Sequence, residues 1–214
     1  MLSSKRSVTV VAGLSGYGKN TFVLRYLVNA DLSARFIFDP DPGEFNPELG
    51  EFADRLGLEP TVSPYELGKH LCRGWVVFNP HTLFEGRPEE GLNFFCDWAY
   101  AHSLALPGEK VIVIDEIWKY CSGNSIPQPI RAVALSGRKA KVQLVVITQE
   151  PQRLNMTLKS AMSEVVCFRL QGEGPLSFAE QFGFDREEVA NLPPLSYVAR
   201  NLDSGGELRG VIAV

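Results

Sequence analysis

Short runs of aliphatic and aromatic residues alternate along the chain with stretches in which apolar residues recur at helical spacing. The runs predict strands at 8–12, 34–39, 75–79, 111–115, 142–148 and 164–170. The periodic stretches predict helices at 19–29, 91–104, 127–139 and 155–162, with shorter ones near 47–56, 64–72, 175–182 and 185–191. This alternation is typical of an α/β fold with a mainly parallel central sheet flanked by helices on both faces.

The end of the chain has a different pattern. Two short alternating runs at 196–202 and 207–214 are separated by the turn-forming sequence at 203–206, which predicts a C-terminal β-hairpin on the edge of the sheet. At 214 residues and 45% hydrophobic composition, the chain is long enough to bury one sizeable core. We therefore expect a single domain over residues 1–214.

Charge and cysteine content narrow the class of protein. A formal net charge of −4 excludes a generally basic coat for nucleic acid, but it permits a local basic surface. The four cysteines, at 72, 96, 121 and 167, form no CxxC pair, so we expect buried free thiols and neither a zinc site nor a disulfide framework. Residues 1–7 precede no hydrophobic segment of a signal peptide, and no apolar run is long enough to span a bilayer. A soluble, unsecreted protein is expected.

The first predicted strand runs directly into a glycine-rich turn and a lysine, in the spacing Gly-x4-Gly-Lys of a phosphate-binding loop. In such a loop, backbone N–H groups surround phosphate oxygens, and the following helix directs its positive end at them. The lysine adds a mobile positive charge. The residues predicted to bind a nucleotide, ATP, are Gly13, Leu14, Ser15, Gly16, Tyr17, Gly18, Lys19, Asn20 and Thr21.

One position departs from the phosphate-loop pattern. The pattern expects a Ser or Thr hydroxyl for Mg²⁺ directly after the lysine, where this chain has Asn20, with Thr21 one step later. Either the Asn20 amide oxygen binds the metal, or Thr21 and water share that role. The metal site therefore remains open between these two residues.

The predicted strand at 111–115 ends in two carboxylates, Asp115 and Glu116. The carboxyl ends of parallel strands gather at the ligand-binding edge of a sheet, so this segment fits a Walker B motif. Asp115 would orient the Mg²⁺ shell, and Glu116 would polarise the water that attacks the γ-phosphate. The next apolar strand ends at Gln149, whose neutral amide can contact the γ-phosphate or the attacking water.

A basic cluster precedes the strand at 142–148, and Arg138 within it is a candidate arginine finger for a neighbouring subunit's nucleotide. Arg131 and Arg153 are the other candidates. A solvated basic helix end is the alternative interpretation of this cluster.

Four segments taken together resemble the FtsK/HerA superfamily of DNA-translocating ATPases. They are the loop at 13–21, the pair Asp39-Pro40, the acids at 115–116, and the basic cluster at 137–140 that leads to Thr148-Gln149. The compact size looks most like the genome-packaging ATPases of tailless, membrane-containing icosahedral phages. The similarity covers about residues 8–170. Where the superfamily has Arg-Pro directly after the strand that ends in Thr-Gln, this chain has Glu150-Pro151.

The resemblance implies a RecA-like core that binds ATP and Mg²⁺ and assembles into a homo-oligomeric ring, a hexamer or a pentamer, around double-stranded DNA. It also implies capsid proteins of the packaging vertex, and a viral membrane protein there, as partners. The host cytoplasm and the virion vertex are the implied locations. Candidates for contact with DNA phosphates, or simply solubilising surface charges, are Lys119, Arg131, Lys139 and Lys141. Trp118 and Tyr120 are candidates for a packing or interface role.

The residues are also compatible with three other functions. A P-loop kinase would transfer phosphate to a small molecule, although two acids and a Thr-Gln end on successive strands suit attack by water better. A nucleotide-binding protein that does not hydrolyse ATP would use the loop as a structural element of an assembly. Within the superfamily, a filamentous-phage assembly motor is the further alternative, which the absence of a membrane segment argues against.

Overall fold

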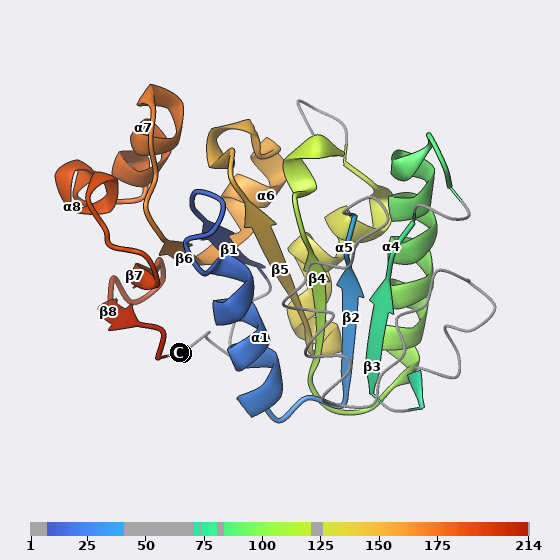
Figure 1. Ribbon diagram of the computed structural model, residues 1–214. Helices are drawn as coiled ribbons and strands as arrows, with labels where there is room; N and C mark the ends of the chain where they lie inside the picture. The colour runs from blue at the N-terminus through green and yellow to red at the C-terminus, as the bar shows by residue number, and fades with distance from the viewer. Residues whose placement is uncertain (1–7, 41–70, 73, 81–83, 121–125, 214) are drawn as a thin grey trace.

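The structure, a computed structural model, describes residues 8–40, 71–72, 74–80, 84–120 and 126–213 (Figure 1). The expected helix at 47–56, and 64–72 apart from its last two residues, lie outside these ranges. The described strands form one sheet in the order β3-β2-β4-β5-β1-β6-β7-β8. Their bounds are β1 Val8–Ala12, β2 Ala34–Phe38, β3 Trp75–Phe78, β4 Lys110–Ile114, β5 Val142–Thr148, β6 Met162–Cys167, β7 Ser196–Asn201 and β8 Glu207–Val211.

The strands from β3 to β6 in this order run parallel, and β1 lies between β5 and β6. The predicted α/β class and central parallel sheet are confirmed. One strand was misplaced: β6 ends at Cys167, whereas 164–170 was expected. Two residues of the expected extension, Phe168 and Leu170, are apolar, but the Leu170 N–H donates to the Val189 carbonyl 3.3 Å away, so the chain turns out of the sheet there.

The helices lie close to the predicted positions, as α1 Lys19–Asn29, α4 Pro88–Ala105, α5 Gln128–Ser136, α6 Met156–Ala161, α7 Glu173–Gln181 and α8 Arg186–Ala190. Helix α4 begins earlier than expected, because Pro88 fits the first turn and two acidic residues there favour a helix N-terminus. Helix α5 is shorter than expected and continues as the 3-10 helix η2, Gly137–Ala140. No helix among the described residues has both the length and the apolar character needed to cross a membrane.

Helices cover both faces of the sheet. Along β4, Ile112 and Ile114 face the cluster formed with α4 and α5, whereas Val111 and Val113 face the cluster formed with α1. Figure 1 shows α1 in front of the sheet and α4, α5 and α6 behind it. Both faces are buried, which explains why these strands are continuous apolar runs with few polar positions.

The C-terminal hairpin is confirmed, and it extends the sheet. β7 pairs antiparallel with β6, and β8 pairs antiparallel with β7 at the edge. Arg209 on β8 forms an ion pair with Glu188 of α8, with Nε and Oε1 2.5 Å apart, and a second with Glu207. The first of these surface pairs joins the outermost strand to α8, whereas the second lies within β8.

The cysteine prediction is only partly correct. Cys96 and Cys167 are buried free thiols, but Cys72 is a free thiol at the surface, and Cys121 lies outside the described residues. Burial raises the pKa of the Cys167 thiol well above its usual range. This thiol is therefore protonated and inert at neutral pH.

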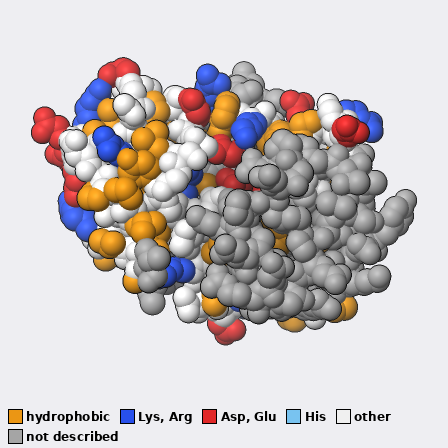
Figure 2. All heavy atoms as spheres, viewed as in Figure 1, with side chains coloured by type: hydrophobic (Ala, Val, Ile, Leu, Met, Phe, Trp, Pro, Cys, Tyr) orange, Lys and Arg blue, Asp and Glu red, His pale blue; other side chains and the backbone are white. Residues whose placement is uncertain are grey.

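The parallel strands all end at the same edge of the sheet, called here the carboxyl edge. The predicted phosphate loop, Asp115 and Gln149 follow β1, β4 and β5 at this edge. Figure 2 shows acidic side chains near the upper centre of the face, over the ends of β4 and β5. In a parallel α/β sheet such an edge is where ligands bind.

Candidate functional site

The loop after β1 is fastened by its backbone to both neighbouring strands. The Gly13 N–H donates to the Thr148 carbonyl at the end of β5, 3.2 Å away, and the Leu14 N–H donates to the Arg169 carbonyl beyond β6, 2.9 Å away. A Cβ atom at position 13 would lie 2.6 Å from the Cβ of Phe168, so only glycine fits. Ser15 and the following glycine are exposed at the tip of the loop.

Helix α1 begins at the end of this loop. Gly18 precedes it with φ +98°, a conformation that L side chains rarely adopt, and a Cβ there would lie 2.8 Å from Leu195 Cδ2. Lys19 is only 7% exposed, and its Nζ donates to the Leu14 carbonyl across the loop, 2.9 Å away. The predicted phosphate-binding residues thus form one compact turn with the lysine folded over it.

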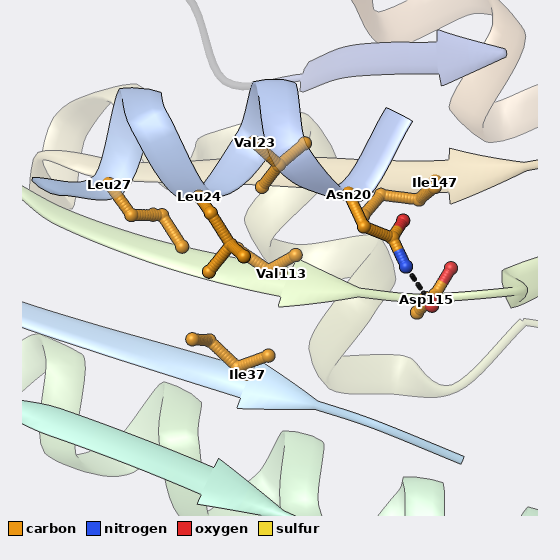
Figure 3. Close-up of a pocket in the computed structure, with 8 residues that line it drawn as sticks. All are labelled: Asn20, Val23, Leu24, Leu27, Ile37, Val113, Asp115 and Ile147. Atoms are coloured by element: carbon orange, nitrogen blue, oxygen red, sulfur yellow. Dashed lines mark hydrogen bonds between the residues drawn. The ribbon is translucent and has the colours of Figure 1, made fainter. Parts of the chain in front are cut away.

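Asn20, the residue that departs from the loop pattern, contacts the first acid of β4. Its Nδ2 lies 3.3 Å from Asp115 Oδ2, and Figure 3 shows the two side chains pointing toward one another. They lie at the polar end of a small pocket between α1 and the sheet, lined otherwise by Val23, Leu24, Leu27, Ile37, Val113 and Ile147. This amide bond ties the first turn of α1 to the end of β4. Thr21, the alternative metal ligand, follows it in the same turn and is half-buried.

Glu116 is held at three points. Its backbone has φ +48°, which is uncommon for a residue other than glycine, and its N–H donates to Asp115 Oδ1 2.9 Å away. Its Oε1 accepts from Gln149 Nε2 at 2.5 Å, and its Oε2 accepts from the Trp118 indole N–H. The side chain is 6% exposed. A carboxylate has about four acceptor positions, so two remain for other donors.

Strand order explains how these groups meet. β5 lies between β1 and β4, so Gln149 at its end stands between the loop and the two acids. The structure therefore brings together the loop at 13–21, Asp115, Glu116 and Gln149, which are the residues that the sequence grouped in one site. Carboxylate and amide oxygens at positions 115 and 20 are ligands of the kind that Mg²⁺ prefers, so this donor set fits the predicted metal.

Arg138 lies elsewhere. It is exposed on η2, which precedes β5, whereas Gln149 follows β5, so the two residues lie at opposite edges of the sheet. The length of β5 separates it from the carboxyl edge by about 20 Å. Arg131 is exposed on α5. Arg153 follows β5 at the carboxyl edge, with Cζ 5.3 Å from the Trp118 ring centroid and Nε 3.5 Å from Glu150 Oε2.

Two residues of the site were missed from the sequence. Trp118 was expected to pack or to form an interface, but it is a hydrogen-bond donor to Glu116. Its position two residues after the acid, within a tight turn, was the available signal. Arg169 was not singled out at all, although its carbonyl holds Leu14 and its guanidinium contacts Tyr17. Its distance of more than 150 positions from the loop left no local pattern to find.

The chain has a RecA-like P-loop NTPase fold, in which a phosphate loop and two acids lie at the carboxyl edge of a mostly parallel sheet. No protein-family model matches the chain, and no curated protein matches it.

Solved structures do match. The genome-packaging NTPase B204 of Sulfolobus turreted icosahedral virus 2, in complex with ATP-gammaS, has a TM-score of 0.76 at 15% identity, over 99% of this chain and 100% of that one. VirB4 of Thermoanaerobacter pseudethanolicus has a TM-score of 0.68 at 14% identity, over 97% and 90%. The bacterial conjugative coupling protein TrwB has a TM-score of 0.66 at 11% identity, over 98% and 85%. The predicted resemblance is thus confirmed at the level of the fold.

Proposed function

We propose that this chain is an ATP-hydrolysing motor that translocates double-stranded DNA and packages a viral genome. The observation that best supports hydrolysis is the hydrogen bond from Gln149 to Glu116 beside the phosphate loop. A buried carboxylate held by two N–H donors, with acceptor positions left over, is suited to accept a proton from water. The similar fold of B204, a genome-packaging NTPase, supports the choice of motor.

In the proposed reaction, the backbone N–H groups of the loop and Lys19 hold the phosphates of ATP. Glu116 accepts a proton from a water molecule while the oxygen of that water forms a bond to the γ-phosphorus. The bond from that phosphorus to the β–γ bridging oxygen breaks, so that ADP and phosphate leave and Glu116 returns the proton to solvent. Gln149 donates its N–H to Glu116 and so fixes the direction of the base.

Asn20, Thr21 and Asp115 would hold Mg²⁺ in this proposal. When bound, Mg²⁺ supplies positive charge that neutralises the β- and γ-phosphate oxygens. The contact between Asn20 and Asp115 keeps the two side chains within reach of the same ion. Asn20 thus substitutes for the usual hydroxyl residue by holding the acid as well as by offering its own amide oxygen.

A ring of identical subunits, a hexamer or a pentamer, is proposed from the position of Arg138. About 20 Å from its own carboxyl edge, Arg138 cannot reach its own nucleotide. An exposed guanidinium there can reach the nucleotide only of a neighbour packed head-to-tail, which is the interface that closes into a ring. Arg153 is instead engaged with its own subunit, against Trp118. Arg138 is therefore the proposed finger in trans.

Packaging gives the remaining proposed partners and places. Double-stranded DNA would pass through the ring, bound mainly through its phosphates and so without sequence preference. Capsid proteins of the packaging vertex, and a viral membrane protein there, would anchor the ring. The host cytoplasm and the virion vertex are the proposed locations.

The first test replaces the proposed base. Glu116→Gln is expected to lower kcat for ATP by about 10²- to 10⁴-fold, because the amide cannot accept the proton, while ATP binding persists. ADP formation and ATP affinity are measured with and without duplex DNA. Glu109→Gln, an exposed acid before β4, is the control and should leave kcat unchanged. Wild-type turnover in Glu116→Gln would refute the assignment, and a wild-type protein inactive even with duplex DNA would refute the motor.

The second test concerns the ring. Arg138→Ala and Lys19→Ala are each expected to be inactive, whereas their mixture should recover activity, because a mixed interface pairs an intact loop with an intact arginine. Arg25→Ala, at an exposed position of α1, is the matched control. Normal activity of Arg138→Ala alone would exclude a finger at this position.

A further inference from the structure

The side of the phosphate loop that faces away from the acids carries a second pair of residues. Tyr17 lies in the loop, and Arg169 follows β6 on the side opposite to β5. Arg169 Nη1 lies 3.2 Å from the Tyr17 hydroxyl oxygen, to which it donates, and its Cζ lies 5.9 Å from the ring centroid. The ring is only partly buried. An aromatic ring and a guanidinium therefore stand together beside the loop.

Several N–H donors of the Arg169 guanidinium have no acceptor among the described residues. A guanidinium has five N–H groups, and within the described part of the chain the Arg169 side chain makes one hydrogen bond, to Tyr17, and no ion pair. Its Nε is buried without a hydrogen-bond partner among those residues. A buried N–H without a partner is costly, so a group of this kind points to a ligand. The carbonyl of Arg169, by contrast, is occupied by the Leu14 N–H and fixes the residue against the loop.

The location of the acids determines which end of ATP reaches this pair. Asp115 and Glu116 follow β4, on the far side of β5 from β1, so the γ-phosphate lies on that side. That side is also occupied by Gln149 and Trp118. The nucleoside must then leave the loop elsewhere, and Figure 2 shows hydrophobic side chains gathered on the other side, between α8 and the loop.

We propose that Tyr17 and Arg169 form the subsite for the nucleoside half of ATP, an inference that rests on the proposed ATP-binding role of the loop. The Tyr17 ring offers a surface for stacking of the purine, since every base has a π face that an aromatic ring can cover. The remaining N–H groups of Arg169 donate to ribose or base acceptors. The hydrogen bond between Tyr17 and Arg169 keeps the ring in place for both contacts.

The test compares two ligands that share a phosphate chain. Affinities for ATP and for inorganic tripolyphosphate, each with Mg²⁺, are measured by titration calorimetry. The wild-type protein is expected to bind ATP about 10-fold more tightly or better, the range that stacking of one base supplies. Tyr17→Leu and Arg169→Gln are expected to lose this preference while tripolyphosphate affinity stays within about twofold of wild type. Arg25→Gln, an exposed arginine of α1, is the control.

Tyr17→Phe guards against loss of folding, because it keeps the ring and removes only the oxygen that Arg169 contacts. It is expected to weaken ATP binding by only about threefold. Parallel loss of ATP and tripolyphosphate affinity in Tyr17→Leu and Arg169→Gln would overturn the proposal, because the residues would then shape the phosphate loop itself. Unchanged ATP affinity in both would overturn it as well. A wild-type protein that binds neither ligand would refute the ATP-binding role, and this inference with it.

Discussion

The two sides of the phosphate loop are built from different kinds of contact. On the acid side, defined by Asp115, Glu116 and Gln149, the contacts join side chains from separate strands. On the hairpin side, defined by Tyr17, Arg169 and Leu195, backbone bonds dominate: the Leu195 N–H donates to the Tyr17 carbonyl at 3.2 Å. Side-chain bonds can change partners when a phosphate leaves, whereas backbone bonds fix the loop. We therefore expect turnover to depend on the acid side and the geometry of the loop to depend on the hairpin side.

Of the variants that test this comparison, Gln149→Leu should have the largest effect on kcat. Leucine keeps the bulk of the side chain but removes the N–H that Glu116 accepts, so we expect kcat for ATP to fall about 10²-fold. The KM for ATP should change little, because the hairpin side is intact. Steady-state ATP hydrolysis measures both. A rise in KM with unchanged kcat would mean that the acid side binds ATP and does not direct its chemistry. Gln143→Leu, within β5, would be a poor control since that side chain joins Tyr26 in a buried network.

Trp118→Phe should have a smaller effect on the same side. Phenylalanine retains an aromatic ring for Arg153 but lacks the indole N–H, so Glu116 loses one of its two side-chain donors. We expect kcat to fall about 10-fold, since a hydrogen bond to a charged group contributes about 1.5–3 kcal/mol.

Two further measurements identify Trp118 as a positioning residue. In Trp118→Phe, kcat should fall while the KM for ATP stays unchanged, because a donor to the base has been removed, and thermal stability should not change. Trp98→Phe, which changes an indole on α4, is the matched control. An unchanged kcat together with a lower melting temperature would indicate that Trp118 only packs.

Leu195→Ala should give the smallest catalytic effect, since it changes the hairpin side without touching Glu116. The Leu195 side chain packs against Gly18, and truncation is expected to lower the free energy of unfolding by about 1–2 kcal/mol at this partly buried position. Denaturant unfolding measures this, and kcat at saturating ATP should remain within about twofold of wild type. A large loss of kcat would show that the two sides are coupled and would break the comparison.

The sequence was a good guide to the strands and a poor guide to contacts between them. β1 and β5 begin and end where their apolar runs do, because a parallel strand that is buried on both faces is mostly apolar. The bond from Asn20 to Asp115 spans 95 positions and depends on strand order, which no local pattern encodes. The same holds for Arg169 beside the loop.

The position of Arg138 could have been inferred from the sequence. It directly precedes a strand that was expected to be parallel to the others, so it had to lie at the edge opposite to the nucleotide. The roles predicted for Arg138 and for the other site residues stay predictions until the variants are measured. The fold of the chain agrees with the resemblance that these residues suggested.

Strand β5, which separates β1 from β4, sets the distance between the phosphate loop and the two acids. Neighbouring strands lie about 4.8 Å apart, so with β5 between them the phosphate loop and the two acids begin about 10 Å apart. In the proposed reaction, three successive contacts of about 3 Å each, from loop amide to phosphate, from phosphorus to water and from water to carboxylate, would fill that interval. The spacing of the strands therefore sets the distance available to the proposed reaction. This spacing is fixed by backbone hydrogen bonds that side-chain substitutions leave in place.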